Sequence, residues 1–426
     1  MSGESMTGPT RPRDRDYAWV ILLIGTLCEF GAVGMGRFGY GMLVPAMQAG
    51  LGMSNTEAGA LATANLVGYL LMSALGGALA TRFGSRIVIS LGMLVAGVGM
   101  VLTGLAAVPL TAAVWRAVTG VGTGGVNVPT MGLVSAWFTR GRRGLAVGIL
   151  LSGNAAALIV SGVVFPRILS AQGGEGWRLC WYLVGGLTLL MSIVGLAVLR
   201  NRSAGGGLDR GLVLQHESSA ATVSSGSALN WRAVYRSGPV LHLGLIYLTY
   251  GFSYIIFMTF FTKRLMSDLE YSKEAAGTLF MLLGWLSLVC GGLWGWLSDR
   301  FGRKPAIISV YVMQTVSLAV FALADSTFSA VFSAVIFGLS SWSVPAIMAA
   351  TCADAVGPRM APAALGLITV FFGVGQAVGP TVAGAMADAA GNFNGAFWLA
   401  TAVAALGTLA ALPLQRRGLE AACTES

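Results

Sequence analysis

The stretches GALATRFGSR (Gly77–Arg86) and GWLSDRFGRK (Gly295–Lys304) share one frame, G-x-x-x-x-R-F-G-x-[RK]. The second stretch begins 218 residues after the first, counted from Gly77 to Gly295, and each copy follows the second long apolar run of its half. A repeat at the same place in both halves predicts that the chain consists of two related halves with the same order of elements.

The composition around these stretches indicates a polytopic membrane protein. Of the 426 residues 55% are hydrophobic and only 10% are charged, whereas a soluble protein carries roughly 25% charged residues. The 60 glycines agree with this, because glycine is more frequent in membrane helices than in soluble ones. The first apolar run exceeds the about 7–15 residues of a signal-peptide core, so we expect it to remain as a helix.

The length of the apolar runs predicts twelve membrane-spanning helices, since about 20 apolar residues cross a bilayer. The expected helices are 17–48, 54–80, 86–107, 109–138, 141–171, 176–199, 239–266, 272–298, 304–324, 327–353, 359–389 and 393–415. We therefore predict an all-α membrane protein with two pseudo-symmetric six-helix halves. The predicted domains are an N-terminal tail (1–16), a first bundle (17–200), a Ser/Gly-rich linker (201–238), a second bundle (239–415) and a C-terminal tail (416–426).

The basic residues agree with this count. With both termini in the cytoplasm, the tails, the linker and the loops on that side hold 19 of the 26 Lys and Arg residues. Such a bias predicts the orientation of the helices. The net charge of +9 is then a topology signal with anionic headgroups as its partner, rather than a nucleic-acid surface. We expect a multi-pass protein of the inner or plasma membrane.

Several chemistries are excluded or unsupported by the sequence. Only two histidines occur, so a histidine-rich metal site is excluded, and no G-x-x-x-x-G-K-[ST] phosphate loop is present. The five cysteines have neither metal-ligand nor redox spacing and are interpreted as small core residues. No nucleophile–base–orienter set is visible, so we expect neither a cofactor nor an enzyme.

The repeated loop resembles the signature loop of the major facilitator superfamily, G-x-x-x-D-R-x-G-R-[RK]. The second copy is complete, whereas the first has Thr81 where the family has aspartate. The resemblance covers nearly the whole chain apart from the tails and linker, and it implies alternating access with a latch at the inner gate. The residues to which it gives this gating role are Gly77, Arg82, Gly84, Arg86, Gly295, Asp299, Arg300, Gly302 and Arg303.

Other stretches narrow the resemblance. RAVTGVGTGG (Arg116–Gly125) and GVGQAVGPTVAG (Gly373–Gly384) are similar to glycine motifs of the family. The corresponding fifth helix has Asn154 where drug/proton antiporters of the family have proline after glycine, which argues against drug export. GRFGYGMLVPAM resembles a bacterial branch, and DYAWVILLIG resembles, less closely, monocarboxylate and oxalate–formate transporters.

Arg37 is the leading candidate for substrate binding. It lies inside an apolar run, where an unpaired charge costs from ~3 kcal/mol to more than ~10 kcal/mol. A buried guanidinium binds carboxylate or phosphate bidentately. In organic-phosphate transporters of the family a substrate-binding arginine stands at matching spacing before a proline, here Pro45, so the resemblance also implies an anion site. The alternative is a structural arginine paired with Glu29 or with helix carbonyls.

Glu29 and Arg116 are the candidates for proton coupling. Glu29 is the only carboxylate well inside a predicted helix, and a buried carboxylate suits a proton carrier; a salt-bridge or packing role is equally open. It precedes Arg37 by about 12 Å along the helix axis, so the two are not direct neighbours. Arg116 shares a helix face with Thr123 and Asn127, and either a gating or a structural role fits it.

Further polar and aromatic residues complete the predicted site. Tyr250 and Tyr254 belong to one stripe on helix 239–266, and Asn65 and Tyr69 share a face of helix 54–80. In a soluble helix such stripes are core; in a transporter they line the pathway. The predicted substrate-binding residues are Arg37, Tyr40, Asn65, Tyr69, Asn127, Tyr250, Tyr254 and Gln376.

These observations predict a secondary transporter for a small organic anion such as a monocarboxylate, with proton coupling as a hypothesis. The expected partners are a small-molecule substrate, protons and the bilayer, and the resemblance implies a monomer. An exporter of drugs or neutral amphipathic solutes is the first alternative, and a non-transporting receptor on the same fold is the second. Substrate identity and transport direction are not fixed by fold alone.

Overall fold

The computed structural model describes residues 12–201 and 236–414. In the first half it contains α1 (Pro12–Cys28), η1 (Glu29–Phe38), α2 (Tyr40–Leu51), α3 (Asn55–Phe83), α4 (Ser85–Leu105), α5 (Pro109–Trp137), α6 (Arg140–Gln172), η2 (Gly173–Glu175) and α7 (Gly176–Val198). In the second half it contains α10 (Gly238–Ser267), α11 (Lys273–Phe301), α12 (Arg303–Ala322), α13 (Thr327–Ser340), α14 (Ser343–Ala390) and α15 (Asn394–Ala411). Nearly all of the predicted tails and linker lie outside the described residues, so the predicted domain boundaries stay a prediction.

The number of crossing helices agrees with the prediction. Ten stretches of the described residues are long and apolar enough to span a membrane, and one of them, Arg142–Val198, contains both α6 and α7. Helix α5 is 29 residues long but is not among these ten stretches. Counting α5 and separating α6 from α7 gives twelve crossings in the part of the chain that the structure describes.

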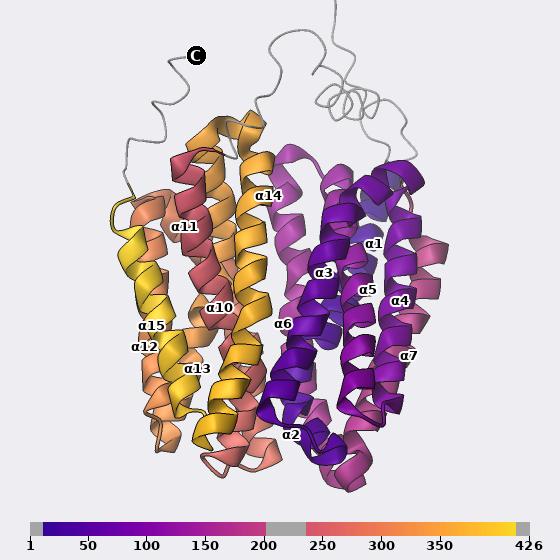
Figure 1. The fold of residues 1–426 in the computed structure, drawn as a ribbon. Helices are drawn as coiled ribbons and strands as arrows, with labels where there is room; N and C mark the ends of the chain where they lie inside the picture. Colours follow the sequence, from indigo (N-terminus) through magenta and orange to yellow (C-terminus); the bar gives the residue numbers. More distant parts are fainter. Residues whose placement is uncertain (1–11, 202–235, 415–426) are drawn as a thin grey trace, which may run out of the picture.

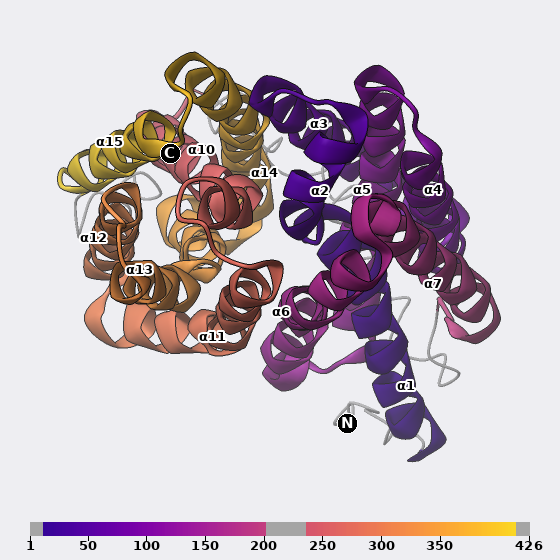
Figure 2. The same ribbon diagram turned by 90° about the horizontal axis from the view of Figure 1, so that it is seen from below.

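The helices gather into two bundles that lie side by side (Figure 1). Seen from below, α2, α3 and α6 of the first bundle face α10, α14 and α11 of the second (Figure 2). Buried hydrophobic residues fill both bundles and the region between them, while many large apolar side chains remain exposed on the outside, such as Leu71, Ile193 and Phe328. An apolar exterior is what a helix bundle presents to lipid.

The predicted helix 17–48 is confirmed as one crossing, but it is not a regular α-helix. Its middle, η1, is a π-helix, and Gly39 N–H donates to the carbonyl of Gly34 at 3.1 Å in the wider five-residue pattern. Single-turn π segments are rare and occur frequently at functional sites. The widened segment begins at Glu29 and ends one residue after Arg37, so it lies between the two predicted charges.

The predicted helices 327–353 and 359–389 correspond to the apolar spans Thr327–Val356 and Ala363–Ala390, but the helical segments are divided at another place. The observed break lies at Ser341 and Trp342, and α14 then continues for 48 residues to Ala390 as one helical segment. Tyr250 explains part of the break, because its hydroxyl donates to the carbonyl of Ser341. The hydroxyl of Ser287 lies 2.8 Å from that of Ser341. Two neighbouring helices therefore hold the break in place.

The repeated loop has the same backbone in both halves. Gly84 ends α3 with φ 87°, and Gly302 ends α11 with φ 98°. Each glycine N–H donates to the carbonyl four residues earlier, at 2.9 Å and 3.0 Å. These backbone angles are nearly restricted to glycine. The structure thus confirms that the two halves are related.

Candidate functional site

Arg37 joins the two halves near the middle of the membrane-spanning bundle. Its Nη2 donates to Oε1 of Gln376 on α14 at 2.6 Å. The guanidinium carbon lies 4.7 Å from the ring centre of Tyr69 and 5.2 Å from that of Phe38. An arginine over aromatic faces is stabilised by the ring quadrupoles. The predicted substrate-binding residues Arg37, Tyr69 and Gln376 therefore meet at one place.

Arg116 lies next to this group and supports the π-helix. Its side chain is 1% exposed, and its Nη1 donates to the carbonyl of Gly36 at 2.5 Å. The guanidinium carbon lies 4.7 Å from the ring centre of Tyr40 and 5.0 Å from that of Trp181. The hydroxyl of Tyr40 donates to the carbonyl of Ala58, so Tyr40 offers the cation only its ring.

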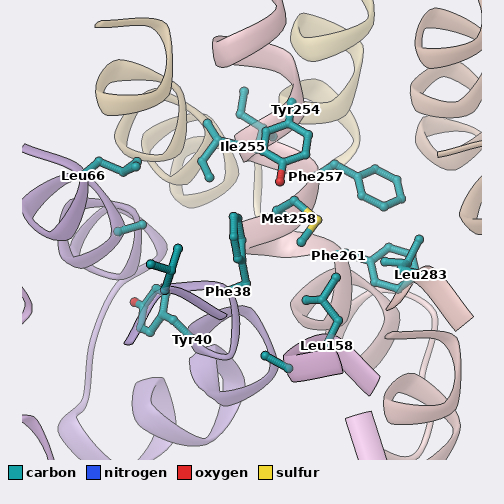
Figure 3. Packing of buried hydrophobic residues seen from close by; sticks show 14 of the residues in the cluster. Phe38, Tyr40, Leu66, Leu158, Tyr254, Ile255, Phe257, Met258, Phe261 and Leu283 are labelled. Atoms are coloured by element: carbon teal, nitrogen blue, oxygen red, sulfur yellow. The ribbon is translucent and has the colours of Figure 1, made fainter. Parts of the chain in front are cut away.

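Arg37 and Arg116 line one cavity between the halves. The first half contributes both arginines, Phe38, Tyr40 and Asn65, and α10 contributes Ile255, Met258 and Thr259. Figure 3 shows Phe38 between Tyr40 of the first half and Met258 of the second. The cavity encloses about 20 Å³, which is room for about one water molecule.

The charge of this cavity is not balanced by a salt bridge. The ion pairs among the described residues are Arg178–Glu175, Arg264–Asp268, Arg303–Asp299 and Arg303–Asp354. None of these pairs contains Arg37 or Arg116. A buried charge without a partner is costly, and guanidinium groups favour carboxylate, sulfonate and phosphate oxygens. The cavity is therefore lined by two guanidinium groups that no ion pair among the described residues neutralises.

Glu29 lies at the other end of η1 and is connected to Arg37 through two side chains. The carboxylate has no exposed surface, and it accepts from Nδ2 of Asn127 at 3.1 and 3.2 Å. The hydroxyl of Tyr69 donates to Oδ1 of Asn127 at 3.2 Å, and the ring of Tyr69 lies under Arg37. A continuous path of contacts therefore joins the buried carboxylate to the cavity arginine.

The second half contributes an aromatic wall, defined here as Tyr247, Tyr250, Tyr254, Trp342 and Phe372. Neighbouring rings stack with centres 4.4–6.0 Å apart. Trp342 Nε1 donates to the hydroxyl of Tyr254 at 2.7 Å, and the Trp342 ring lies 5.6 Å from that of Phe38. The hydroxyl of Tyr250 is bound to the backbone, so Tyr250 shapes the wall and does not face the cavity.

The predicted site residues thus divide into three groups. Arg37, Tyr40, Asn65 and Arg116 line the cavity, while Tyr69, Tyr254 and Gln376 lie beside it. Asn127, also predicted to bind substrate, donates to Glu29 and does not line this cavity. Tyr250 lies behind Tyr254.

Sequence reasoning missed the second half's lining residues Ile255, Met258 and Thr259. Their i, i+3, i+4 spacing on one helix face was the signal that marked them. It also missed Trp181, which stacks on Arg116.

The two copies of the gating loop differ in their charges. Arg303 pairs with Asp299 at 2.5 Å and with Asp354 at 2.9 Å. In the first half, Arg86 donates to the carbonyl of Leu196, and its N–H donates to Asn201. The missing aspartate at Thr81 is thus replaced by neutral acceptors.

The described residues show at which end the halves are joined. The side-chain hydrogen bonds between the halves lie near the middle, as for Arg37–Gln376 and Thr63–Thr381, or at the end opposite the repeated loops. At that opposite end Asp388 accepts from the N–H groups of Asn55 and Thr56 at 2.9 and 2.8 Å. The bundle is therefore tied together on one side of the cavity.

Comparisons with known proteins agree with this architecture. The family model described as "Uncharacterised MFS-type transporter YbfB" matches residues 30–412. The probable sulfoacetate transporter SauU of Cupriavidus necator is 24% identical, with 92% of this chain and 93% of that protein covered. Monocarboxylate transporter 13 of Rattus norvegicus is 26% identical, with 96% and 92% covered.

A solved structure shares the fold. It is that of a bacterial homologue of the human lysosomal transporter Spinster in an inward-facing, unoccupied conformation, with a TM-score of 0.74, 18% identity, and 95% of this chain and 98% of that chain covered. The family match spans almost all of the described helices. The chain therefore belongs to the MFS-type transporter family of that model, within the major facilitator superfamily, and is a secondary transporter rather than an enzyme.

Proposed function

We propose that this transporter carries a small organic anion, such as a monocarboxylate, and that Arg37 binds its acidic group. The carrying observation is the cavity between the halves, which is lined by the buried Arg116 and the partly buried Arg37, with no carboxylate in an ion pair with either among the described residues. An anionic substrate supplies the charge that the protein does not. The names of two relatives, a sulfoacetate and a monocarboxylate transporter, support an acidic substrate.

The proposed transport cycle opens and closes the bundle around this cavity. A carboxylate with a carbon skeleton is larger than the space for one water molecule, so the halves must separate at Arg37–Gln376 and Phe38–Trp342 to admit it. We propose that residues 17–200 and 239–415 are the two bodies that move. The gating role that the resemblance implies for both loop copies belongs to this proposal.

The proposed orientation follows the basic residues. The end that carries Arg82, Arg86, Arg300 and Arg303 faces the cytoplasm, with both termini on that side of an inner or plasma membrane. The hydrogen bonds of Asp388 and Thr56 then belong to the outer gate.

Proton coupling through Glu29 is the second part of the proposal. Glu29 is fully buried, and the path through Asn127 and Tyr69 ends at the ring that supports Arg37. An anion at Arg37 changes the charge next to this path, so binding of substrate and of a proton are linked. Arg116 is assigned a supporting role here, because it fixes the backbone at Gly36 between the two groups.

Uptake into vesicles reconstituted with the purified protein tests the proposal. Radiolabelled propanoate is expected to enter faster under an imposed pH gradient than without one, and Arg37→Gln is expected to abolish uptake. Arg167→Gln is the matched control, because it removes the same charge from an exposed side chain at the end of α6. Uptake of an organic cation instead, unaffected by Arg37→Gln, would favour the alternative of an exporter of amphipathic solutes.

A further inference from the structure

Three residues that line the cavity each have a buried polar atom without a hydrogen-bond partner among the described residues. These atoms are Nε of Arg37, Nε of Arg116 and Oδ1 of Asn65. Two of the atoms are donors and the third is an acceptor. A buried polar atom that lacks a partner destabilises the protein, so such a set indicates a ligand that completes it.

The orientation of the Asn65 amide is fixed by the backbone. Its Nδ2 donates to the carbonyl of Arg116 at 3.0 Å. Turning the amide over would place oxygen against oxygen, so Oδ1 is the atom that remains for the ligand. The acceptor is thus as well defined as the two donors.

The two donors and the one acceptor together favour some ligands over others. A single water molecule can accept twice and donate once, but it leaves both guanidinium charges uncompensated. A plain carboxylate or sulfonate supplies charge and acceptors, yet it turns a lone pair towards Oδ1 of Asn65. An ammonium group supplies a donor but adds positive charge beside two arginines. A carboxylate with a neighbouring hydroxyl supplies charge, two acceptors and one donor.

We infer that the substrate is a short hydroxy acid whose carboxylate binds Arg37 and Arg116 and whose hydroxyl donates to Asn65. This inference rests on the proposed anion transport and narrows its substrate class. The remaining lining includes the apolar residues Phe38, Leu66, Ile255 and Met258. A substrate with many hydroxyl groups would therefore leave most of its hydroxyls without a hydrogen-bond partner. The hydroxyl of Thr259 can donate or accept and therefore does not decide the class.

Binding to the purified full-length protein tests this inference. Isothermal titration compares 2-hydroxypropanoate with propanoate and 2-oxopropanoate, which have the same three-carbon skeleton but lack the donor. The hydroxy acid is expected to bind about tenfold more tightly than either analogue. Asn65→Leu is expected to reduce this ratio to about one while the protein still binds propanoate.

The ratio within each variant is the informative quantity, because it does not depend on how much of a destabilised variant is folded. Gln314→Leu is the matched control: it removes a buried amide on α12 that does not line the cavity, and the tenfold ratio is expected to persist. A ratio of one in the wild type, with all three acids bound, overturns the inference and leaves the proposed function intact. A ratio of ten that survives Asn65→Leu overturns the role of Asn65. Failure to bind any of the acids overturns the proposed function as well.

Discussion

The two halves of this transporter have related backbones but contribute different chemistry to the space between them. The first half supplies both cavity arginines and the buried carboxylate of Glu29. The second half supplies stacked aromatic rings and a single amide, that of Gln376, which accepts from Arg37. The difference teaches that a repeated fold does not imply a repeated site, because the cavity arginines belong to one half and the stacked aromatic rings to the other.

The same contrast recurs in the repeated loops. Gly84 and Gly302 have nearly the same φ, whereas Arg86 contacts neutral acceptors and Arg303 contacts two carboxylates. The backbone requirement has been kept in both copies, and the charges have diverged. Variants that change either the loop backbone or the loop charges therefore test the two parts of this comparison one at a time.

Among the variants that compare the two halves, Glu29→Gln is expected to have the largest effect. Glutamine keeps the size and a hydrogen-bonding oxygen but cannot carry a proton, so uptake driven by a pH gradient should fall at least about tenfold. Exchange of labelled for unlabelled carboxylate without a gradient should remain. Both are measured in the same vesicles. Glu175→Gln, the same change at an exposed position, is the control and should have no effect. Gradient-driven uptake that persists in Glu29→Gln would disprove coupling through this residue.

An intermediate effect is expected from alanine at the two loop glycines. Each substitution forces a side chain into backbone angles that cost about 1–3 kcal/mol, so both halves should be destabilised. Gly84→Ala should cost more, because an added Cβ would meet the side chain of Asn201, whereas at Gly302 it would meet only Pro305 at 3.8 Å.

Chemical unfolding of the detergent-purified variants measures both changes. Gly291→Ala is the control, since this helical glycine has open space around it and alanine should be neutral or stabilising there. If alanine at Gly84 or Gly302 is as little destabilising as alanine at Gly291, the two loops do not share a requirement for glycine.

The smallest effect is expected from the loop charges. Asp354 is about half exposed, and exposed ion pairs contribute about 0.2–1 kcal/mol. Asp354→Asn should therefore lower the free energy of unfolding by less than about 1 kcal/mol. In the first half, the loss of unfolding free energy caused by Asn201→Ala should not depend on salt, because the Asn201 side chain contacts the backbone N–H of Arg86 and not its charge. Chemical unfolding at low and high ionic strength measures both effects. If Asp354→Asn and Asn201→Ala depend equally on salt, the proposed difference between the two loops is disproved.

Much of the fold could be predicted from the sequence because a bilayer imposes simple constraints. Apolar runs between charged breaks gave the twelve crossings, and the copies at Gly77 and Gly295 gave the two halves. The break at Ser341 and Trp342 was not predictable in this way, because it depends on a hydroxyl from another helix, that of Tyr250. The π-helical form of η1 likewise produces no change in hydrophobicity.

The charged residues of the candidate site could be predicted from the sequence, but the contacts between its side chains could not. Arg37 and Glu29 stand out because charged residues inside apolar runs are rare. The path between them runs through Tyr69 and Asn127 on two other helices, and spacing along one helix cannot reveal such neighbours. The role of Asn65 as an acceptor beside two donors likewise appears only when three helices are placed together.

Binding of 2-hydroxypropanoate to purified protein with and without Arg37 tests the central claim most directly. Arg37→Gln should weaken binding by at least about 30-fold, because a desolvated charge pair contributes about 2 kcal/mol or more. Arg37→Lys should recover only part of the affinity, since lysine lacks the planar fork. The Arg167→Gln control should bind like the wild type, and all variants are measured by isothermal titration. Equal affinity in the wild type and Arg37→Gln would contradict the account and make Arg37 a structural link to Gln376.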